Sequence, residues 1–265
     1  MINKNQIYNI KINHDAVLKI MIDKVNNKIP TSFIRRGDGE NIIIGYRYIK
    51  GIRLRKYLKK IRHFNISYFN ISFQKFFRNE LIKSFYEADF IGVHTQHYYY
   101  GYSSSVRKFE EEITNYFQFN KKKYIDNHFQ FAFIKKEDSN RLNSPLAEDL
   151  ISNKKIGLIS HFNLSDFLSK FNSEVISQIS IPKRDLRSIN IKMDKKKYDN
   201  ILNFIKENAN KVDVWFLGAG VYAKPFGNYI KNCGGIALDL GSSIDTWANE
   251  YHSRKFLRNK SWKIK

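Results

Sequence analysis

The second half of the chain alternates strand-like runs with helix-like runs, and this alternation constrains the fold more than any other feature. The strand-like runs are rich in apolar and β-branched residues and comprise 154–160, 174–181, 211–220 and 235–241. The runs between them carry apolar residues at helical spacing and comprise 163–171, 195–210 and 222–234. Strands that alternate with helices predict an α/β fold with a Rossmann-like, mostly parallel sheet and helices on both of its faces.

The first half is less regular but fits the same scheme. Helices are expected at 14–27, 41–49, 73–87 and 106–118, and strands at 31–36 and 88–95. The region from about 45 to 150 carries no functional motif. The sequence has no internal repeat and no Gly/Ser-rich or Pro-rich linker, so we expect one domain that spans residues 1–265.

Cysteine content and charge limit the class of protein. Cys233 is the only cysteine, which excludes an internal disulfide and fits a reducing, cytoplasmic compartment. No signal peptide is recognisable, and no apolar stretch approaches the roughly 18 residues of a spanning helix. The net charge of +21 favours anionic partners such as nucleic acid, anionic lipid or phosphorylated molecules. The lysines are spread along the whole chain, however, so a generally basic solvated surface explains the charge at least as well.

Two carboxylates stand out in "SFIRRGDGEN", residues 32–41. Asp38 and Glu40 follow a predicted strand, and Gly37 and Gly39 let the backbone turn around them. Two such acids can hold Mg²⁺ or Mn²⁺ together with substrate phosphates. The structural alternative is that Asp38 caps the next helix while Glu40 interacts favourably with the positive N-terminal end of the helix dipole.

A glycine-rich turn follows the strand at 211–220. Gly218 and Gly220 precede a predicted helix, so backbone N–H groups there could face an anion, and Lys224 could reach a phosphate. The stretch is neither a complete dinucleotide fingerprint nor a P-loop. A tight strand-to-helix turn that needs glycine for packing is the alternative interpretation.

Two further carboxylates lie in "ALDLGSSIDTW", residues 237–247. Asp239 ends a predicted strand and could hold a sugar hydroxyl, and Asp245 follows it and could act as a general base. The alternatives are a structural acid that binds loop amides at Asp239 and a helix N-cap at Asp245.

Histidines also follow predicted strands: His94 and His97 after one, and His161 after another. Their positions allow ligand contact, but no HExxH or Cys/His spacing indicates zinc. The tyrosines near residue 100 could stack on a sugar or a base, or pack over the core. No Gly-x-Ser-x-Gly elbow supports a hydrolase triad.

The residues around Asp38 resemble the signature of the bacterial GT-D glycosyltransferases, formerly the DUF1792 domain of unknown function. Ser32, Arg35, Gly37, Asp38, Gly39 and Glu40 fall on that signature. "LGAG", Ala223-Lys224 and "ALDLGSSID" resemble the family's later Gly-rich and Asp-x-Gly segments. Ser242 and Ser243 stand where the members known to us have a histidine.

The resemblance implies a metal-dependent enzyme that moves a sugar from a nucleotide-sugar, most simply a UDP-sugar, to a surface-glycan, polysaccharide or glycoprotein acceptor. It implies that Asp38 and Glu40 hold Mn²⁺ or Mg²⁺. Arg35 or Arg36, together with Lys224, would then face the diphosphate, with Gly37, Gly39, His161, Gly218, Gly220 and Asp239 around the donor. Asp245 is the candidate for contact with the acceptor hydroxyl.

A lipid-linked acceptor would place the enzyme at the inner membrane face, where the basic segment 253–265 could touch anionic lipid. A frayed basic tail is the alternative interpretation of this segment, and it is favoured over lipid contact. Two alternatives belong to other classes. A basic nucleic-acid-binding protein would keep its binding without Asp38 and Glu40, although no RRM, KH or helix-turn-helix signature appears. A metal-dependent nucleotide phosphohydrolase or phosphotransferase would consume a nucleotide without a sugar acceptor.

Overall fold

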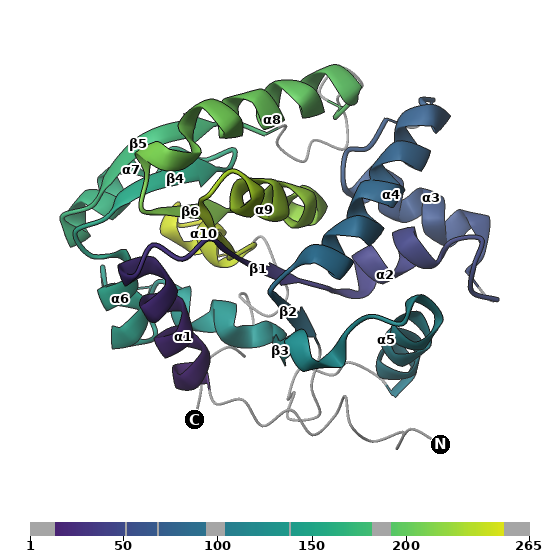
Figure 1. Ribbon diagram of the computed structural model, residues 1–265, viewed down its shortest axis with the longest axis horizontal. Coiled ribbons are helices and arrows are strands. Elements are labelled where there is room, and N and C mark those ends of the chain that lie inside the picture. Colours follow the sequence, from purple (N-terminus) through teal and green to yellow (C-terminus); the bar gives the residue numbers. More distant parts are fainter. Residues whose placement is uncertain are drawn as a thin grey trace.

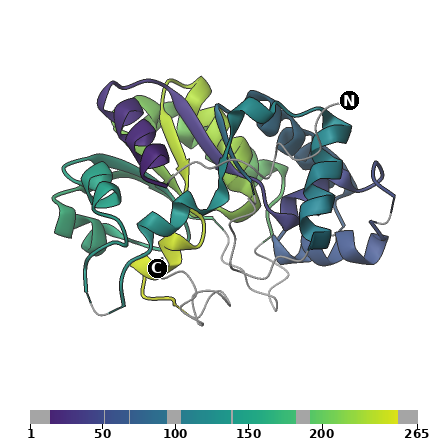
Figure 2. The same cartoon turned by 90° about the horizontal axis from the view of Figure 1, so that it is seen from below.

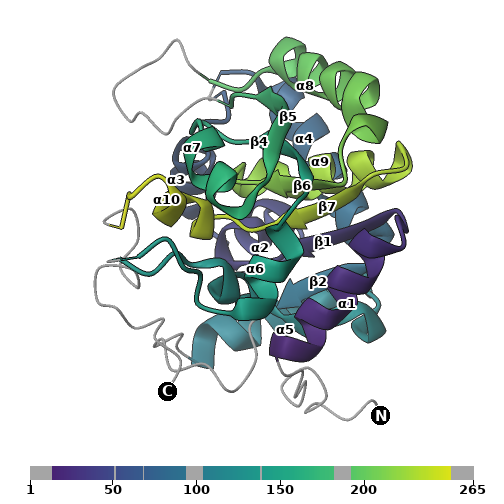
Figure 3. The ribbon, with the colours of Figure 1, turned by 90° about the vertical axis from the view of Figure 1, so that its left-hand side faces the viewer.

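The centre of the molecule is a seven-stranded sheet in the order β3-β2-β1-β7-β6-β4-β5, in which every neighbouring pair is parallel. The computed structural model describes residues 14–50, 52–67, 69–93, 104–137, 139–181 and 192–251. The strands are β1 (Thr31–Arg35), β2 (Phe90–Val93), β3 (Tyr124–Asp126), β4 (Lys155–Ile159), β5 (Glu174–Ile179), β6 (Val214–Leu217) and β7 (Ile236–Asp239). Most of the sheet is seen stacked from β5 to β2 in Figure 3. The predicted α/β class with a parallel sheet is therefore confirmed.

Helices cover both faces of this sheet. The α-helices are α1 (His14–Asn26), α2 (Asp38–Gly45), α3 (Leu54–His63), α4 (Ile71–Glu87), α5 (Ser104–Phe117), α6 (Pro145–Ile151), α7 (Ser165–Leu168), α8 (Lys195–Asn208), α9 (Ala223–Asn232) and α10 (Ser243–Trp247). Short 3-10 turns join several of them, of which η3 (Asn127–Phe133) is the longest. Figure 1 shows α2 to α5 gathered on one side of the molecule, and Figure 2 shows the same group from below.

Burial along β6 explains why its residues form a central strand. Val214 and Phe216 belong to one apolar core, and Trp215 and Leu217 belong to the other, on the opposite face. A strand buried on both faces reads as a continuous apolar run, which is how it appears in the sequence. The core that contains Trp215 and Leu217 lies under α4, α8 and α9, and the core that contains Val214 and Phe216 lies under α1, α6 and α10.

Most predicted elements in the second half lie where they were expected. The helix expected at 163–171 is shorter, because α7 ends at Leu168 and continues only as a 3-10 turn, Ser169–Phe171. The expected helix at 41–49 starts earlier, at Asp38, so the two acids lie within its first turn. The sequence did not predict α3, β3 or α6. No helix in the described part of the chain combines the length and apolar character that crossing a membrane requires.

Candidate functional site

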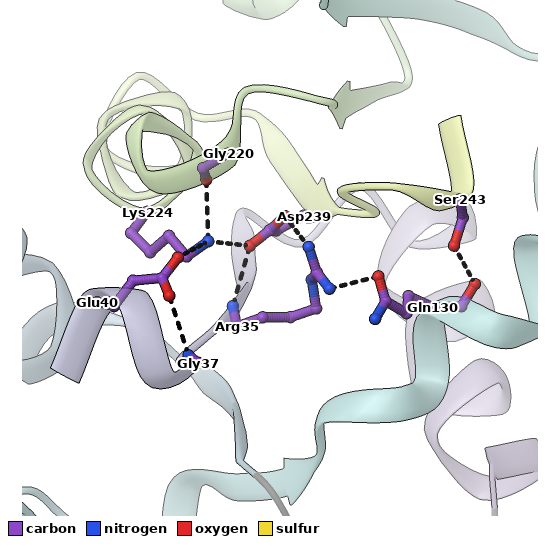
Figure 4. Close-up of polar contacts among 8 residues, drawn as sticks. All are labelled: Arg35, Gly37, Glu40, Gln130, Gly220, Lys224, Asp239 and Ser243. Carbon is purple, nitrogen blue, oxygen red and sulfur yellow. Dashed lines mark hydrogen bonds and ion pairs between the residues drawn. The ribbon is translucent and has the colours of Figure 1, made fainter. Parts of the chain in front are cut away.

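The order of the strands brings three sequence motifs to one edge of the sheet. Because β7 lies between β1 and β6, the residues that follow these three strands meet at their carboxyl ends. Arg35 ends β1, Asp239 ends β7, and Lys224 lies in α9, which follows β6. Glu40 reaches the same place from α2 (Figure 4). These four side chains are called the charge cluster below.

Lys224 lies at the centre of the charge cluster and is almost fully buried, with a relative exposure of 2%. Its Nζ lies 2.7 Å from Oε1 of Glu40 and 3.0 Å from Oδ2 of Asp239, and it donates to the carbonyl of Gly220 at 2.9 Å. An ammonium group has three donor protons, so these three acceptors satisfy it. Lys224 therefore ties α2, β7 and the turn after β6 together.

Asp239 is fully buried and is held mainly by Arg35 on its other side. The backbone N–H of Arg35 donates to Oδ2 at 3.2 Å, and its Nη2 donates to Oδ1 at 3.1 Å. Nη1 of Arg35 also donates to the side-chain oxygen of Gln130, and the backbone carbonyl of Gln130 accepts from Ser243 Oγ at 2.7 Å. The buried aspartate is thus neutralised by two cations, which is the condition for keeping a charge out of water.

Glu40 has a structural role at the start of α2. Its Oε2 accepts the N–H of Gly37, the N-cap residue, at 3.2 Å, as the third residue of a helix often does. Burial raises the pKa of Glu40, but the nearby Lys224 ammonium and its hydrogen bond more than offset this, so the pKa lies below its usual value. The structural alternative assigns the cap to Asp38 and the dipole interaction to Glu40; in the structure Gly37 is the N-cap residue, Asp38 follows it, and Glu40 makes the capping hydrogen bond.

Asp38 lies at the rim of the site and differs from Glu40 in exposure. Half of its side-chain surface is accessible, and its Oδ2 lies 2.8 Å from Nζ of Lys60 in α3. Lys60 is itself partly exposed. Asp38 and Lys60 thus form a partly exposed ion pair beside the charge cluster, since Asp38 lies two residues before Glu40 in α2.

The glycines around the site make close backbone approaches possible. A Cβ on Gly39 would lie 2.6 Å from the ring of Phe64, so the Phe64 ring at the end of α3 packs directly on the backbone of α2. Gly220 adopts φ +56°, which favours glycine, and presents its carbonyl to Lys224. A Cβ on Gly218 would lie 3.2 Å from Ser160 Oγ, next to the turn that follows β4. The packing explanation of the GAG turn has direct support in these contacts.

Two of the remaining predicted residues, His161 and Asp245, lie just after β4 and β7, two strands of the same sheet. His161 follows β4, is half-buried, and lies with its ring centroid 3.9 Å from that of Phe162. Asp245 lies in the first turn of α10 and is half-buried, and Ser242 rather than Asp245 occupies the N-cap position. His94 and His97 lie outside the described residues.

Arg36 does not face the site, which corrects one expectation. Its side chain is fully buried between the rings of Phe119 and Tyr124, each 5.2 Å from the guanidinium carbon. It donates to Tyr124 Oη at 3.1 Å and lies 3.6 Å from Glu110. Arg36 therefore holds α5 and β3 against β1, and Arg35 alone of the two arginines joins the charge cluster.

The sequence did not identify three residues of the site: Lys60, Gln130 and Gly241. Lys60 and Gln130 come from the region in which no functional motif was found. Gly241 lies within "ALDLGSSID" and has φ +51°, and a Cβ there would lie 1.7 Å from Nη2 of Arg35. Its place two residues after Asp239 was the available signal.

The expected metal ligands, Asp38 and Glu40, offer a cation different surroundings. Both oxygens of Glu40 are engaged, one by Lys224 and one by Gly37, so a cation shared by the two acids does not fit this arrangement. Asp38 fits a hard cation that takes one protein carboxylate and substrate phosphates. Within the described ranges, no three His, Cys, Asp or Glu side chains group as a metal site.

Comparisons with a family model and with solved structures point to the same fold family. A family model described as a GT-D fold-like domain matches residues 12–247. A solved structure described as having "a distinct glycosyltransferase fold", of the domain of unknown function 1792, superposes with a TM-score of 0.53 at 18% identity, covering 99% of this chain and 87% of the other. A glycosyltransferase (DUF1792) from Streptococcus sanguinis gives a TM-score of 0.50 at 16% identity, over 87% and 82% of the two chains. No curated protein matches.

Proposed function

The chain belongs to the GT-D fold-like domain family and shares the fold of its structural relatives, from which we infer that it is a glycosyltransferase. We propose that it moves a sugar from a nucleotide-sugar, most simply a UDP-sugar, to a surface-glycan, polysaccharide or glycoprotein acceptor. The proposal includes a divalent cation, Mn²⁺ or Mg²⁺, at the donor site and a cytoplasmic location, with the acceptor side at the inner membrane face.

The observation that carries the proposal is that Asp38, paired with Lys60, lies in the first turn of α2 two residues before Glu40 of the charge cluster, which itself lies at the carboxyl ends of β1, β7 and β6. Ligands of open parallel sheets bind at this edge. A donor diphosphate brings several negative charges, and one half-exposed carboxylate cannot bind them unaided. A cation on Asp38 together with the Lys60 ammonium would supply the missing positive charge.

The buried residues have a different task from those at the rim. The paired charges of Lys224, Glu40 and Asp239 fix the start of α2 and therefore the position of Asp38. Preorganised charges of this kind cost no rearrangement when charge develops on the leaving diphosphate. When bound, the divalent cation supplies charge stabilisation to the departing phosphates. Asp245 is proposed to contact the acceptor hydroxyl, since it lies on α10 directly after β7.

Calorimetric titration of UDP, GDP and CMP, with and without Mn²⁺, tests the proposal. We expect saturable, Mn²⁺-dependent binding of one nucleotide to the wild type and its loss in Asp38→Asn. Lys195→Met is the control, because Lys195 forms an exposed ion pair with Asp199 on α8, away from the rim. Both variants should remain folded, since Asp38 and Lys195 are half-exposed.

Three outcomes would overturn the proposal. Nucleotide binding that ignores both Mn²⁺ and Asp38→Asn would remove the metal-bound diphosphate. If the nucleotide were consumed as fast without a sugar acceptor as with one, the protein would be a phosphohydrolase and not a transferase. RNA binding that competes with nucleotide and survives Asp38→Asn would favour the nucleic-acid alternative.

A further inference from the structure

The corner between α3 and α4 exposes apolar side chains that the core leaves uncovered. Phe69 is 90% exposed and Ile71 is 73% exposed, the two highest values among large hydrophobic residues in the described chain. They lie two positions apart, where the chain enters α4. Solvent exposure of a phenylalanine and an isoleucine together is costly unless something covers them.

The same corner is strongly cationic. Residues 41–79 contain ten lysines and arginines and no aspartate or glutamate. In α3, Tyr57 and Ile61 point into the core, while Arg55, Lys59 and Arg62 are exposed on the outer side of the helix. Lys75 is exposed one turn after Ile71 in α4. The apolar pair is therefore flanked by exposed cations.

A second segment adds lysines to the corner. Ile66 forms a parallel bridge with Met193, and the Met193 N–H donates to Asn65 at 2.9 Å. This pairing brings the start of α8, with exposed Lys195 and Lys196, beside the entry to α4, and the two helix ends lie near each other in Figure 1. The Lys195 ammonium lies 4.6 Å from the ring centroid of Phe76 in α4.

We propose that this corner, defined by Phe69, Ile71, Arg62, Lys75 and the start of α8, is the face that binds an anionic lipid surface. Phe69 and Ile71 would enter the interface between headgroups and acyl chains, and the cations would meet the headgroup charge. Isoleucine has no ring to stack on a base, which favours lipid over single-stranded nucleic acid as the occupant.

The corner is joined to the candidate site by α3 itself. Lys60, in the same helix, contacts Asp38, and the Phe64 ring packs against Gly39. Binding of α3 to a membrane would therefore hold the rim of the site at the headgroup level. The inference that the acceptor is carried by the membrane rests on the proposed function, whereas the inference that this corner binds lipid does not.

Co-sedimentation with vesicles tests the lipid-binding face. The full chain should bind vesicles of phosphatidylcholine mixed with phosphatidylglycerol and should not bind phosphatidylcholine alone. Phe69→Ser/Ile71→Ser should weaken binding by at least about tenfold, because the apolar contact is lost. Arg62→Gln/Lys75→Gln should weaken it by on the order of tenfold through lost headgroup attraction.

Matched controls separate this face from general basic character. Lys136→Gln/Lys206→Gln removes two exposed lysines elsewhere, and Ile29→Ser removes a partly exposed isoleucine between α1 and β1. Both control variants should bind mixed vesicles as the wild type does. Nucleotide titration of all variants should be unchanged, so failure of the lipid face and failure of the transferase assignment can be told apart.

Three results would overturn the lipid-binding face. Equal losses in the control and test charge variants would mean diffuse electrostatic adsorption. Vesicle binding that is unchanged in Phe69→Ser/Ile71→Ser would remove the apolar pair from the contact. Absence of vesicle binding, with either RNA binding or self-association that depends on these residues, would assign the corner to nucleic acid or to a second copy of the chain.

Discussion

The guanidinium of Arg35 lies against the backbone of Gly241, so closely that a Cβ at position 241 would be 1.7 Å from Nη2. This contact is possible because Gly241 has no side chain and adopts φ +51°. It lets Arg35 reach both Asp239 and Gln130 across the end of β7. The glycine is therefore a condition for the charge cluster and not only a turn residue.

Gly241→Ala should destabilise the protein by at least about 2 kcal/mol, because it combines backbone strain with displacement of Arg35. Urea unfolding measures the loss. Gly234→Ala is the matched control, since Gly234 also has a left-handed φ, of +87°, but meets only Asn210 at 3.2 Å. Equal losses in the two variants would mean that Arg35 is not displaced.

Lys224→Met should cost about 3–5 kcal/mol, because it leaves the buried carboxylates of Glu40 and Asp239 without their shared cation. Lys195→Met, which breaks an exposed pair with Asp199, should cost no more than about 1 kcal/mol. Chemical denaturation of both variants gives the comparison. Similar losses at the two positions would contradict the central role of Lys224.

The contribution of Glu40 should depend on pH. Its pKa is lowered in the folded state, so the stability from its ionised form is present above the unfolded value of about 4.5 and is lost as pH falls below it. Glu40→Gln should therefore be less stable than the wild type near neutral pH, and the difference should shrink in acid. Unfolding curves from pH 7 to about pH 3 measure this. A gap that stays constant over that range would exclude the ion pair as its origin.

Gly39→Ala should destabilise by about 1–3 kcal/mol despite the better helix propensity of alanine, because its Cβ would meet the Phe64 ring at 2.6 Å. Replacing the Phe64 ring by the smaller leucine side chain should relieve the overlap with the methyl group that Gly39→Ala introduces. We expect the double variant Gly39→Ala/Phe64→Leu to lose less stability than the two single losses combined, as a double-mutant cycle would show. Strict additivity would mean that the two residues do not touch.

Much of the fold could be predicted from the sequence, because β4, β6 and β7 are largely buried apolar runs and the strands from 154 onward alternate with clear helices. Strand β3 could not be, since three residues are too few to show a periodicity and the strand is defined by its pairing with β2, which is distant in sequence. Helix α3 buries only Tyr57 and Ile61, and two buried residues among many lysines and arginines give too weak a periodic pattern to predict a helix.

The candidate site could be predicted in its members but not in its pairings. Parallel strands end at one edge, so the motifs after β1, β6 and β7 were expected to lie near each other. That Lys224 faces Glu40 and Asp239 depends on β7 lying between β1 and β6, and local sequence does not encode that order. Lys60 reaches Asp38 from a helix that had not been predicted.

The charge cluster is electrically neutral: Arg35 and Lys224 contribute +2 and Glu40 and Asp239 contribute −2. The net charge of +21 therefore lies outside it. Dissolved salt screens exposed charges much more than buried ones. Raising the ionic strength should slow the encounter with an anionic substrate while leaving the shape of the cluster, and the rate of the step that follows encounter, nearly unchanged.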